Sequence, residues 1–198
     1  MNPITPLMPQ QPVPPLEVPL VGGGRWRLAD EQPRLFTMVV FYRGRHCSIC
    51  ARYLAELEAK LPAFDERGVN VIAISADTED RAAAAKQAWK LERLRIGYGL
   101  DFDVARQWGL YLSAGKYVTR QGVGEPPVFI EPALYLVRPD GRLYYGSVQT
   151  MPFGRPAFDE ILHAIDFGVT RNFPARGDVL DHRTVQASEG SEILHKQG

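Results

Sequence analysis

The chain has 198 residues, of which 45% are apolar and 23% charged, as in an ordinary soluble globular protein. Basic and acidic residues balance at 23 each, so no overall field attracts nucleic acid or an anionic membrane, and we expect neither as a partner. No apolar stretch approaches the roughly 18 residues of a membrane span, and Met1–Pro15 lacks the pattern of a secretory signal. We therefore expect a cytoplasmic protein, in which a lone close pair of cysteines is more often catalytic or metal-binding than structural.

Proline recurs through residues 1–20, which excludes a helix or a central strand and predicts an extended arm. A short edge strand is expected over 25–28. The arm and the polar tail lack periodic apolar residues, so we expect neither to contribute to the main core. The expected organisation is an arm over 1–20, one domain over 21–171 and an irregular tail over 172–198.

Apolar patterning predicts strand, helix, strand and helix in the first half of the domain. Two continuous apolar runs, over 36–42 and 69–75, indicate strands that are buried on both faces. Between them lies a helix that ends at Gly68. Its buried stripe recurs at spacings of four and three: Cys50, Leu54, Leu57, Leu61 and Phe64. Asp77 or Thr78 is expected to cap the alanine-rich helix that follows.

The second half of the domain contains shorter elements. They are a strand over 95–99, a helix over 102–108, a loop over 112–129, two strands over 133–137 and 143–147, and a last helix that begins near Pro156 with the stripe Phe158, Ile161, Ile165 and Val169. Pro139-Asp140-Gly141 between the two late strands indicates a β-hairpin. Alternating strands and helices followed by a hairpin predict an α/β fold with a central mixed sheet and helices on both faces.

The segment Cys47-Ser48-Ile49-Cys50 follows a buried strand and opens a helix. Unpaired N–H groups and the dipole at a helix N-terminus favour negative charge, so a cysteine there should have a lowered pKa and a larger thiolate fraction. Arg43, Arg45 and His46 are expected to add positive charge nearby. The two thiols are neighbours across one helical turn and can close a small disulfide ring.

Helical geometry also predicts different roles for the two cysteines. Cys50 belongs to the apolar stripe, so its sulfur should face inward, whereas the sulfur of Cys47 at the cap should be more exposed. By this argument Cys47 makes the first attack, and Cys50 resolves the product into a disulfide.

The cysteine pair has three other possible roles. Two ordinary core cysteines would explain Cys50, but not the cap position of Cys47. Half of a zinc site is a second alternative. Its other two ligands would have to come from histidines that form no paired motif: His46, His163, His182 and His195. A cysteine hydrolase would need a separate histidine base, and His46 is too close in sequence to serve.

The segment Phe41-Tyr42-Arg43-Gly44 running into Cys47-Ser48-Ile49-Cys50 resembles the active-site segment of peroxiredoxin-like proteins of the alkyl hydroperoxide reductase and thiol-specific antioxidant (AhpC/TSA) family. Three further stretches are similar to this family: 71–77, 132–141 and 173–177. The resemblance covers roughly residues 16–180. It implies a thioredoxin-like fold, antioxidant thiol oxidoreductase activity at a redox-active centre, and frequently a homodimer.

The chain also departs from the peroxiredoxin pattern P-x-x-x-T-x-x-C. Arg43 stands at the proline position, Cys47 at the threonine position and Cys50 at the position of the peroxide-reacting cysteine. This alignment favours Cys50 as the nucleophile, whereas helix geometry favours Cys47. Peroxiredoxins also supply an arginine from the start of the late strand. Glu131-Pro132 occupies that place here and resembles the cis-proline of thioredoxins.

These observations predict a thiol-dependent oxidoreductase that uses a reversible Cys47–Cys50 disulfide to reduce peroxides or protein disulfides. The predicted catalytic residues are Cys47, Cys50, Arg43 and Pro132. No bound cofactor or metal is needed, because a thioredoxin- or glutathione-type system would supply the reducing power. The alternative is a non-enzymatic redox-sensing or binding protein of the same fold.

Overall fold

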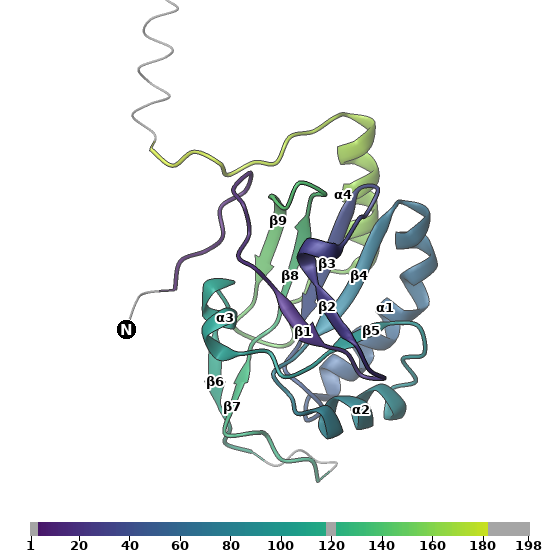
Figure 1. Cartoon of the computed structure of the whole chain (residues 1–198), viewed down its shortest axis with the longest axis vertical. Coiled ribbons are helices and arrows are strands. Elements are labelled where there is room, and N and C mark those ends of the chain that lie inside the picture. The colour runs from purple at the N-terminus through teal and green to yellow at the C-terminus, as the bar shows by residue number, and fades with distance from the viewer. Residues whose placement is uncertain (1–3, 118–121, 182–198) are drawn as a thin grey trace, which may run out of the picture.

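Five strands form the central sheet, in the order β5-β4-β3-β8-β9 (Figure 1). They are β3 (Phe36–Phe41), β4 (Val69–Ile74), β5 (Arg95–Gly97), β8 (Ala133–Val137) and β9 (Leu143–Val148). The computed structural model describes residues 4–117 and 122–181. Strand β3 pairs in parallel with β4 and antiparallel with β8, so the sheet is mixed. The predicted fold class is confirmed.

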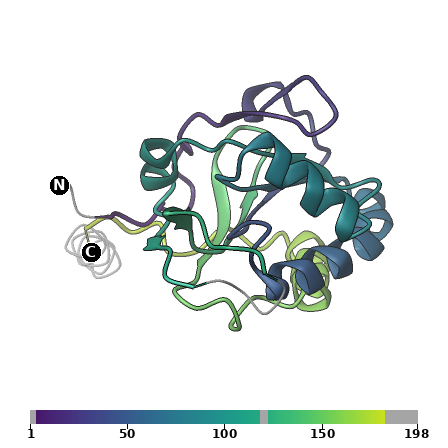
Figure 2. The same cartoon turned by 90° about the horizontal axis from the view of Figure 1, so that it is seen from below.

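Helices and the N-terminal arm cover the two faces of this sheet. The helices are α1 (Ser48–Glu66), α2 (Glu79–Ala88), α3 (Phe102–Gln107) and α4 (Phe158–Thr170). Alternate residues of β3 point to opposite faces: Met38 and Val40 pack in the core beneath α1 and α4, whereas Val39 and Phe41 pack on the α3 side. Figures 1 and 2 show the arm and the α1–α4 layer on opposite sides of the sheet.

The helix α1 has the buried stripe that its sequence predicts. Cys50, Leu54, Leu57 and Phe64 are buried, and Leu61 packs half-buried beside them. Pro62 lies inside the helix and removes one backbone donor. The carbonyl of Glu58, four residues earlier, instead accepts a hydrogen bond from Arg93 Nη2 at 3.2 Å. The helix ends before Gly68, whose φ of +72° is readily adopted by glycine.

The expectation that the arm stays outside the core is wrong. Its residues Glu17–Pro19 form β1, which pairs antiparallel with β2 (Arg25–Arg27), and the short helix η1 (Leu28–Asp30) follows. Leu16 and Val18 are only 4% and 1% exposed, in the core cluster on the α3 side. An extended segment points every second side chain inward, so two well-spaced apolar residues suffice to anchor it despite the flanking prolines.

Two further predictions need correction. The segment 112–129 is not all loop, because β6 (Leu112–Ala114) and β7 (Val128–Ile130) pair antiparallel at its two ends. In the last helix, Phe158, Ile161 and Ile165 are buried as predicted, but Val169, in the final turn of the helix, is 56% exposed.

In the part of the chain that the structure describes, no helix is long and apolar enough to cross a membrane.

Candidate active site

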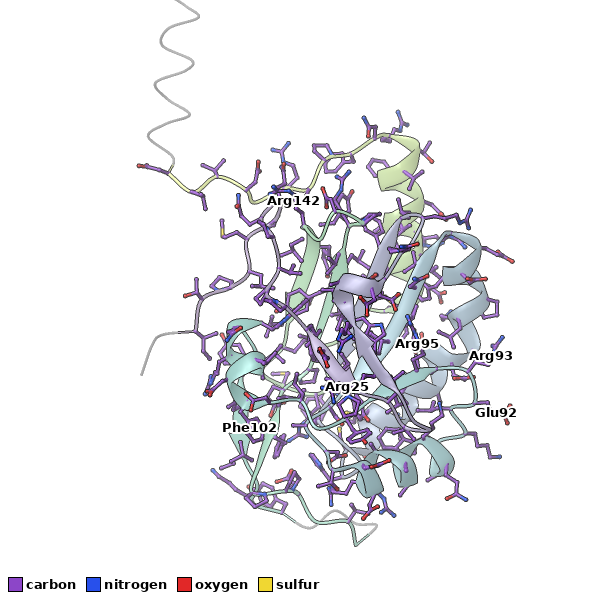
Figure 3. All side chains as sticks on the ribbon, viewed as in Figure 1. Arg25, Glu92, Arg93, Arg95, Phe102 and Arg142 are labelled. Carbon is purple, nitrogen blue, oxygen red and sulfur yellow. The ribbon has the colours of Figure 1, made fainter. Side chains whose placement is uncertain are left out.

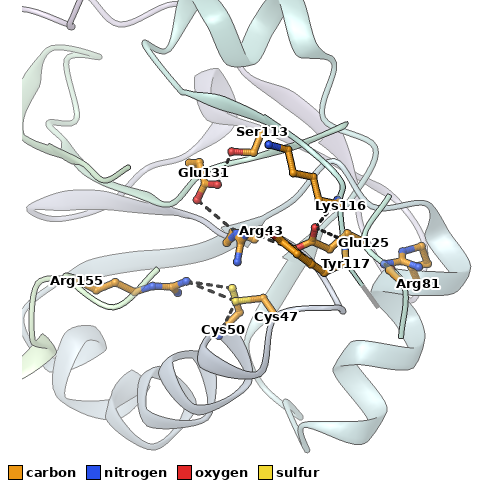
Figure 4. Close-up of polar contacts among 11 residues, drawn as sticks. Arg43, Cys47, Cys50, Arg81, Ser113, Lys116, Tyr117, Glu125, Glu131 and Arg155 are labelled. Atoms are coloured by element: carbon orange, nitrogen blue, oxygen red, sulfur yellow. Dashed lines mark hydrogen bonds and ion pairs between the residues drawn. The ribbon is translucent and has the colours of Figure 1, made fainter. Parts of the chain in front are cut away.

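The loop between β3 and α1 brings the two cysteines together at the start of the helix (Figure 4). Cys47 is the N-cap of α1 in an extended conformation, and its sulfur accepts a hydrogen bond from the backbone N–H of Cys50 at 3.4 Å. Both are free thiols. Cys50 is completely buried and Cys47 is only 4% exposed, so the predicted ranking of exposure holds although both sulfurs are well covered.

Asp77 fixes this loop from the end of β4. One carboxylate oxygen accepts from the backbone N–H of Arg45 at 2.7 Å, and the other accepts from Arg81 Nε at 2.9 Å. Gly44 has a φ of +126°, and a Cβ there would lie 2.7 Å from the Asp77 carboxylate. Thr78 is the N-cap of α2 without a side-chain cap bond. The cap of α2 was expected at Asp77 or Thr78. Thr78 occupies the cap position, whereas the Asp77 carboxylate holds the loop that carries the cysteines.

The two thiols have opposite pKa shifts. A hydrogen bond from the Cys50 side chain is the largest influence on Cys47. Burial raises the pKa of Cys47, but the backbone N–H of Cys50 and the charges of Arg155 and Arg43 lower it as well. The net result is a pKa of about 6 for Cys47. Burial raises the pKa of Cys50 well above its usual value, and the adjacent Cys47 raises it further. Arg155 lowers the pKa of Cys50, but by less. Cys47 therefore carries the thiolate near neutral pH, and Cys50 is its hydrogen-bond donor.

Arg155 is the site residue that sequence reasoning missed. It lies between β9 and α4, and its Nη2 donates to the sulfur of Cys50 at 3.1 Å and lies 4.0 Å from that of Cys47 (Figure 4). Its guanidinium lies 5.0 Å from the ring centre of Tyr53. The segment around it has neither periodicity nor a motif, and only the fold brings it across 105 residues to Cys50.

Arg43, predicted as a catalytic residue, faces two carboxylates near the cysteines. Its guanidinium lies 3.5 Å from Glu125 and 3.3 Å from Glu131, and 4.5 Å above the ring of Phe129. Glu131 also accepts from Ser113 Oγ at 2.6 Å. The charge of Arg43 is thus largely compensated, which is consistent with its place as the last contribution to the lowered pKa of Cys47.

The Glu131–Pro132 bond is trans, so the expected cis-proline is not present. The backbone on both sides of the bond continues regular pairing: the N–H of Glu131 donates to Tyr111 O at 2.8 Å, and Pro132 O accepts from Gln149 N at 2.9 Å. A trans peptide carries the chain directly from β7 into β8 and keeps both hydrogen bonds. The Glu131 side chain points toward Arg43 (Figure 4).

The expectation that His46 adds positive charge is wrong. Its ring is only 2% exposed and packs 4.7 Å from the ring of Phe129, and among the described residues neither ring nitrogen has a hydrogen-bond partner. Burial, followed by the charge of Arg43, lowers the pKa of His46 to about 4. The imidazole is therefore neutral at neutral pH, because the loop buries it, and it adds no positive charge beside Cys47.

The histidines weighed as zinc ligands do not gather around the cysteines within the described residues. Among residues 4–117 and 122–181, no three His, Cys, Asp or Glu side chains form a group that could hold a metal ion. His182 and His195 lie outside the described residues.

Comparison with known proteins places the chain in a family. The profile of the AhpC/TSA family matches residues 9–145, more than half of the sequence. The chain belongs to the AhpC/TSA family. A probable 1-Cys peroxiredoxin from Syntrichia ruralis is 25% identical to it over 164 residues, which cover 73% of this chain and 74% of the relative.

Solved peroxiredoxins share the fold of this AhpC/TSA protein. The reduced 2-Cys peroxiredoxin of Plasmodium vivax superposes with a TM-score of 0.68 at 18% identity, covering 85% of this chain and 86% of the other. The peroxidoxin BcpB of Mycobacterium tuberculosis gives a TM-score of 0.63 at 14% identity, covering 81% and 97%. With its family membership, the chain is a thiol-dependent peroxide-reducing enzyme, an antioxidant oxidoreductase.

Proposed function

We propose that Cys47 is the thiolate that attacks the peroxide and that Cys50 resolves the product into a reversible Cys47–Cys50 disulfide. The observation that carries this proposal is the position of Cys47 at the N-cap of α1, where the thiol and backbone N–H of Cys50 lower its pKa to about 6. The thiolate is the reactive form of cysteine. Cys50 is buried and has a raised pKa, which suits a thiol that reacts second.

The chemistry balances with these two sulfurs. The Cys47 thiolate attacks the terminal peroxide oxygen, the O–O bond breaks, and the alkoxide or hydroxide leaves and takes up a proton. The sulfur, oxidised by two electrons, becomes a sulfenic acid. The Cys50 thiolate then attacks this sulfur, the S–O bond breaks, and hydroxide leaves and becomes water. An external thiol reduces the disulfide in two exchange steps.

Burial of both sulfurs favours a small peroxide over a protein disulfide as the oxidising substrate. A protein disulfide must bring its own sulfur into line with the attacking thiolate, but Cys47 is only 4% exposed. A hydroperoxide needs space for two oxygen atoms. Arg43, held in place by Glu125 and Glu131, contributes only weakly to the stability of the Cys47 thiolate.

The reductant, assembly and compartment are further parts of the proposal. A thioredoxin- or glutathione-type thiol restores the dithiol, and a relative of similar fold is named thioredoxin peroxidase I in Plasmodium yoelii. A homodimer is proposed from the resemblance to the AhpC/TSA family, and a Plasmodium yoelii protein of similar fold, modified at its N-terminus, forms an artifactual octamer. A lone close pair of cysteines with a catalytic role suits the cytoplasm, where structural disulfides are rare.

Stopped-flow peroxide titration of the wild type, Cys47→Ser and Cys50→Ser tests the order of attack. We expect Cys50→Ser to accumulate a sulfenic acid at position 47, detected by dimedone labelling and peptide mass spectrometry. Cys47→Ser should lose peroxide reactivity by a factor of about 100 or more, since only a buried thiol with a raised pKa remains. A sulfenic acid at Cys50 in the Cys47→Ser protein, formed at the wild-type rate, would reverse the assignment.

A further inference from the structure

Arg155 lies against the second sulfur rather than the first. Its Nη2 is 3.1 Å from Cys50 Sγ and 4.0 Å from Cys47 Sγ, so only the former distance is that of a close N–H···S hydrogen bond. Cys47 already has two donors of its own, the thiol and backbone N–H of Cys50. Arg155 therefore contacts Cys50 directly and acts on Cys47 only from a longer distance, as one of several groups that lower its pKa.

The guanidinium is held in place from several sides. Arg155 Nε donates to Pro152 O at 2.9 Å, and its plane lies over the ring of Tyr53 on α1. Tyr53 in turn donates its hydroxyl to Pro156 O at 2.8 Å, which ties the segment to the helix that carries Cys50. The guanidinium is consequently oriented before the reaction begins.

No carboxylate neutralises Arg155 among the described residues, in contrast to Arg43 with its two glutamates. Its Nη1 is buried and has no hydrogen-bond partner within residues 4–117 and 122–181. A half-buried cation without a carboxylate partner is stabilised by an anion that forms in contact with it. The sulfur of Cys50 is the group in contact with it.

The charge of the cysteine pair changes during the reaction. In the resting enzyme the Cys47 thiolate opposes ionisation of Cys50, and burial opposes it as well. Once Cys47 is oxidised to an uncharged sulfenic acid, that repulsion disappears while Arg155 remains. Cys50 must lose its proton at this stage in order to attack.

We propose that Arg155 is a catalytic residue of the second step: it stabilises the Cys50 thiolate that closes the disulfide, and the same thiolate when it leaves on reduction. This inference rests on the proposed order of attack. In closure, the S–S bond forms as the S–O bond of the Cys47 sulfenic acid breaks and hydroxide leaves. In reduction, an external thiolate attacks Cys47 Sγ, and Cys50 departs as an anion beside Arg155.

Single-turnover kinetics of Arg155→Met and Arg155→Lys separate the two steps. Sulfenic acid formation at Cys47 is followed by rapid quenching with dimedone, and closure by loss of free thiols. We expect Arg155→Met to slow closure by about tenfold or more, and Arg155→Lys to restore part of the rate. Measured at pH 8, sulfenic acid formation should change by less than about threefold, because the two donors from Cys50 lower the pKa of Cys47 more than Arg155 does and keep it largely ionised. Arg52→Gln, an exposed arginine on the same helix, is the control for general loss of charge.

A second measurement uses no peroxide. In Cys47→Ser the uncharged hydroxyl stands in for the uncharged sulfenic acid, so the ultraviolet thiolate absorbance reports Cys50 alone. Adding Arg155→Met should raise the pKa of Cys50, whereas adding Arg52→Gln should leave it nearly unchanged. Equal Cys50 titrations with and without Arg155, or unchanged closure in Arg155→Met, would overturn the inference. A wild type that forms no sulfenic acid at Cys47 would instead reject the proposed function.

Discussion

The contrast between Cys47 and Cys50 comes from one turn of helix. The same hydrogen bond that stabilises the Cys47 thiolate keeps the proton on Cys50, so the lowered and raised pKa values share a cause. Helix periodicity identified the inward-facing cysteine, and the cap position identified the other. This part of the site could be predicted from sequence because it depends only on residues within one turn.

Substitution of Cys50 tests that shared hydrogen bond. Cys50→Ser keeps a hydroxyl donor, whereas Cys50→Ala keeps only the backbone N–H. Since the Cys50 side chain is the largest influence on Cys47, we expect the pKa of Cys47 to be higher in Cys50→Ala than in Cys50→Ser. The pH dependence of iodoacetamide alkylation of Cys47 measures both values. Equal values would mean that the helix terminus, and not the neighbouring thiol, lowers the pKa.

His46 makes stability depend on pH in the weakly acidic range. Its pKa is about 4 in the folded protein against 6.5 as the ordinary value, so the unfolded chain binds the additional proton between these values. Stability contributed by the neutral ring is complete above pH 6.5 and falls as pH decreases toward 4. The full effect is about 3 kcal/mol.

Urea unfolding of wild type and His46→Phe at several pH values measures this contribution. The phenyl ring keeps the contact with Phe129 and removes two buried nitrogens without partners, so at neutral pH the variant should be as stable or more stable. Toward pH 4 the difference should grow in favour of the variant. Parallel stability curves would show that the imidazole is hydrated or paired in solution.

Arg155, by contrast, has no local signal that could have predicted it. The end of β9, the segment 149–157 and the ring of Tyr53 together place Arg155 beside Cys50. These parts lie far from Cys50 or outside any regular element, so no sequence pattern connects them. The charge state of His46 was missed for a related reason. Sequence shows that a histidine adjoins Cys47, but its pKa depends on how deeply the fold buries it.

At the scale of elements, the sequence predicts well those strands and helices that are long enough for their pattern of apolar residues to be recognised. All six residues of β3 are buried, as its continuous apolar run indicates, and α1 has its expected stripe. The strands β6 and β7 have three residues each, which is too short for alternation to be visible. Strands β6 and β7 pair with each other across an intervening segment whose glycines and prolines indicate only a loop.

The loop between β3 and α1 gives a prediction at this scale. In Gly44→Ala the new Cβ would contact the Asp77 carboxylate at a φ that side chains rarely adopt. We expect a loss of about 2–4 kcal/mol. Gly23→Ala is the matched control, because Gly23 has a φ of +102° but no atom within 4 Å of the added Cβ. Equal losses in urea unfolding would show that the Asp77 contact yields without cost.

At the scale of the whole molecule, the arm is part of the folded core. Leu16 and Val18 contact the same cluster as residues of β3 and β4, so removing residues 1–20 would uncover that face of the sheet. Composition did not reveal this, because proline restricts backbone conformation without preventing an extended strand from packing. Two buried side chains in a proline-rich segment are too few to form an apolar pattern from which burial could be predicted.

Alanine substitution tests the contribution of the arm. We expect Leu16→Ala to lower the free energy of unfolding by about 2–4 kcal/mol, as for other buried leucines. Leu180→Ala is the control, since this leucine in the C-terminal segment is 74% exposed and should change stability by less than about 0.5 kcal/mol. Chemical unfolding followed by tryptophan fluorescence provides both values. A Leu16 variant as stable as the control would restore the view of a detached arm.

The arm also pairs with the beginning of β9, the last strand of the sheet, and with the turn that precedes it. Leu143 exchanges backbone hydrogen bonds with Gln10 and Gln11, and the N–H of Val13 donates to Gly141 O. The side chain of Arg142, labelled in Figure 3 beside the arm, donates to Gln10 O. A strand with an unpaired side can recruit strands of other molecules, and proline-rich cover is a common protection. A nick by a protease near residue 13 would therefore do more than shorten the chain. It would leave an open template for growth of the sheet, and aggregation should follow cleavage even where the cysteines remain reduced.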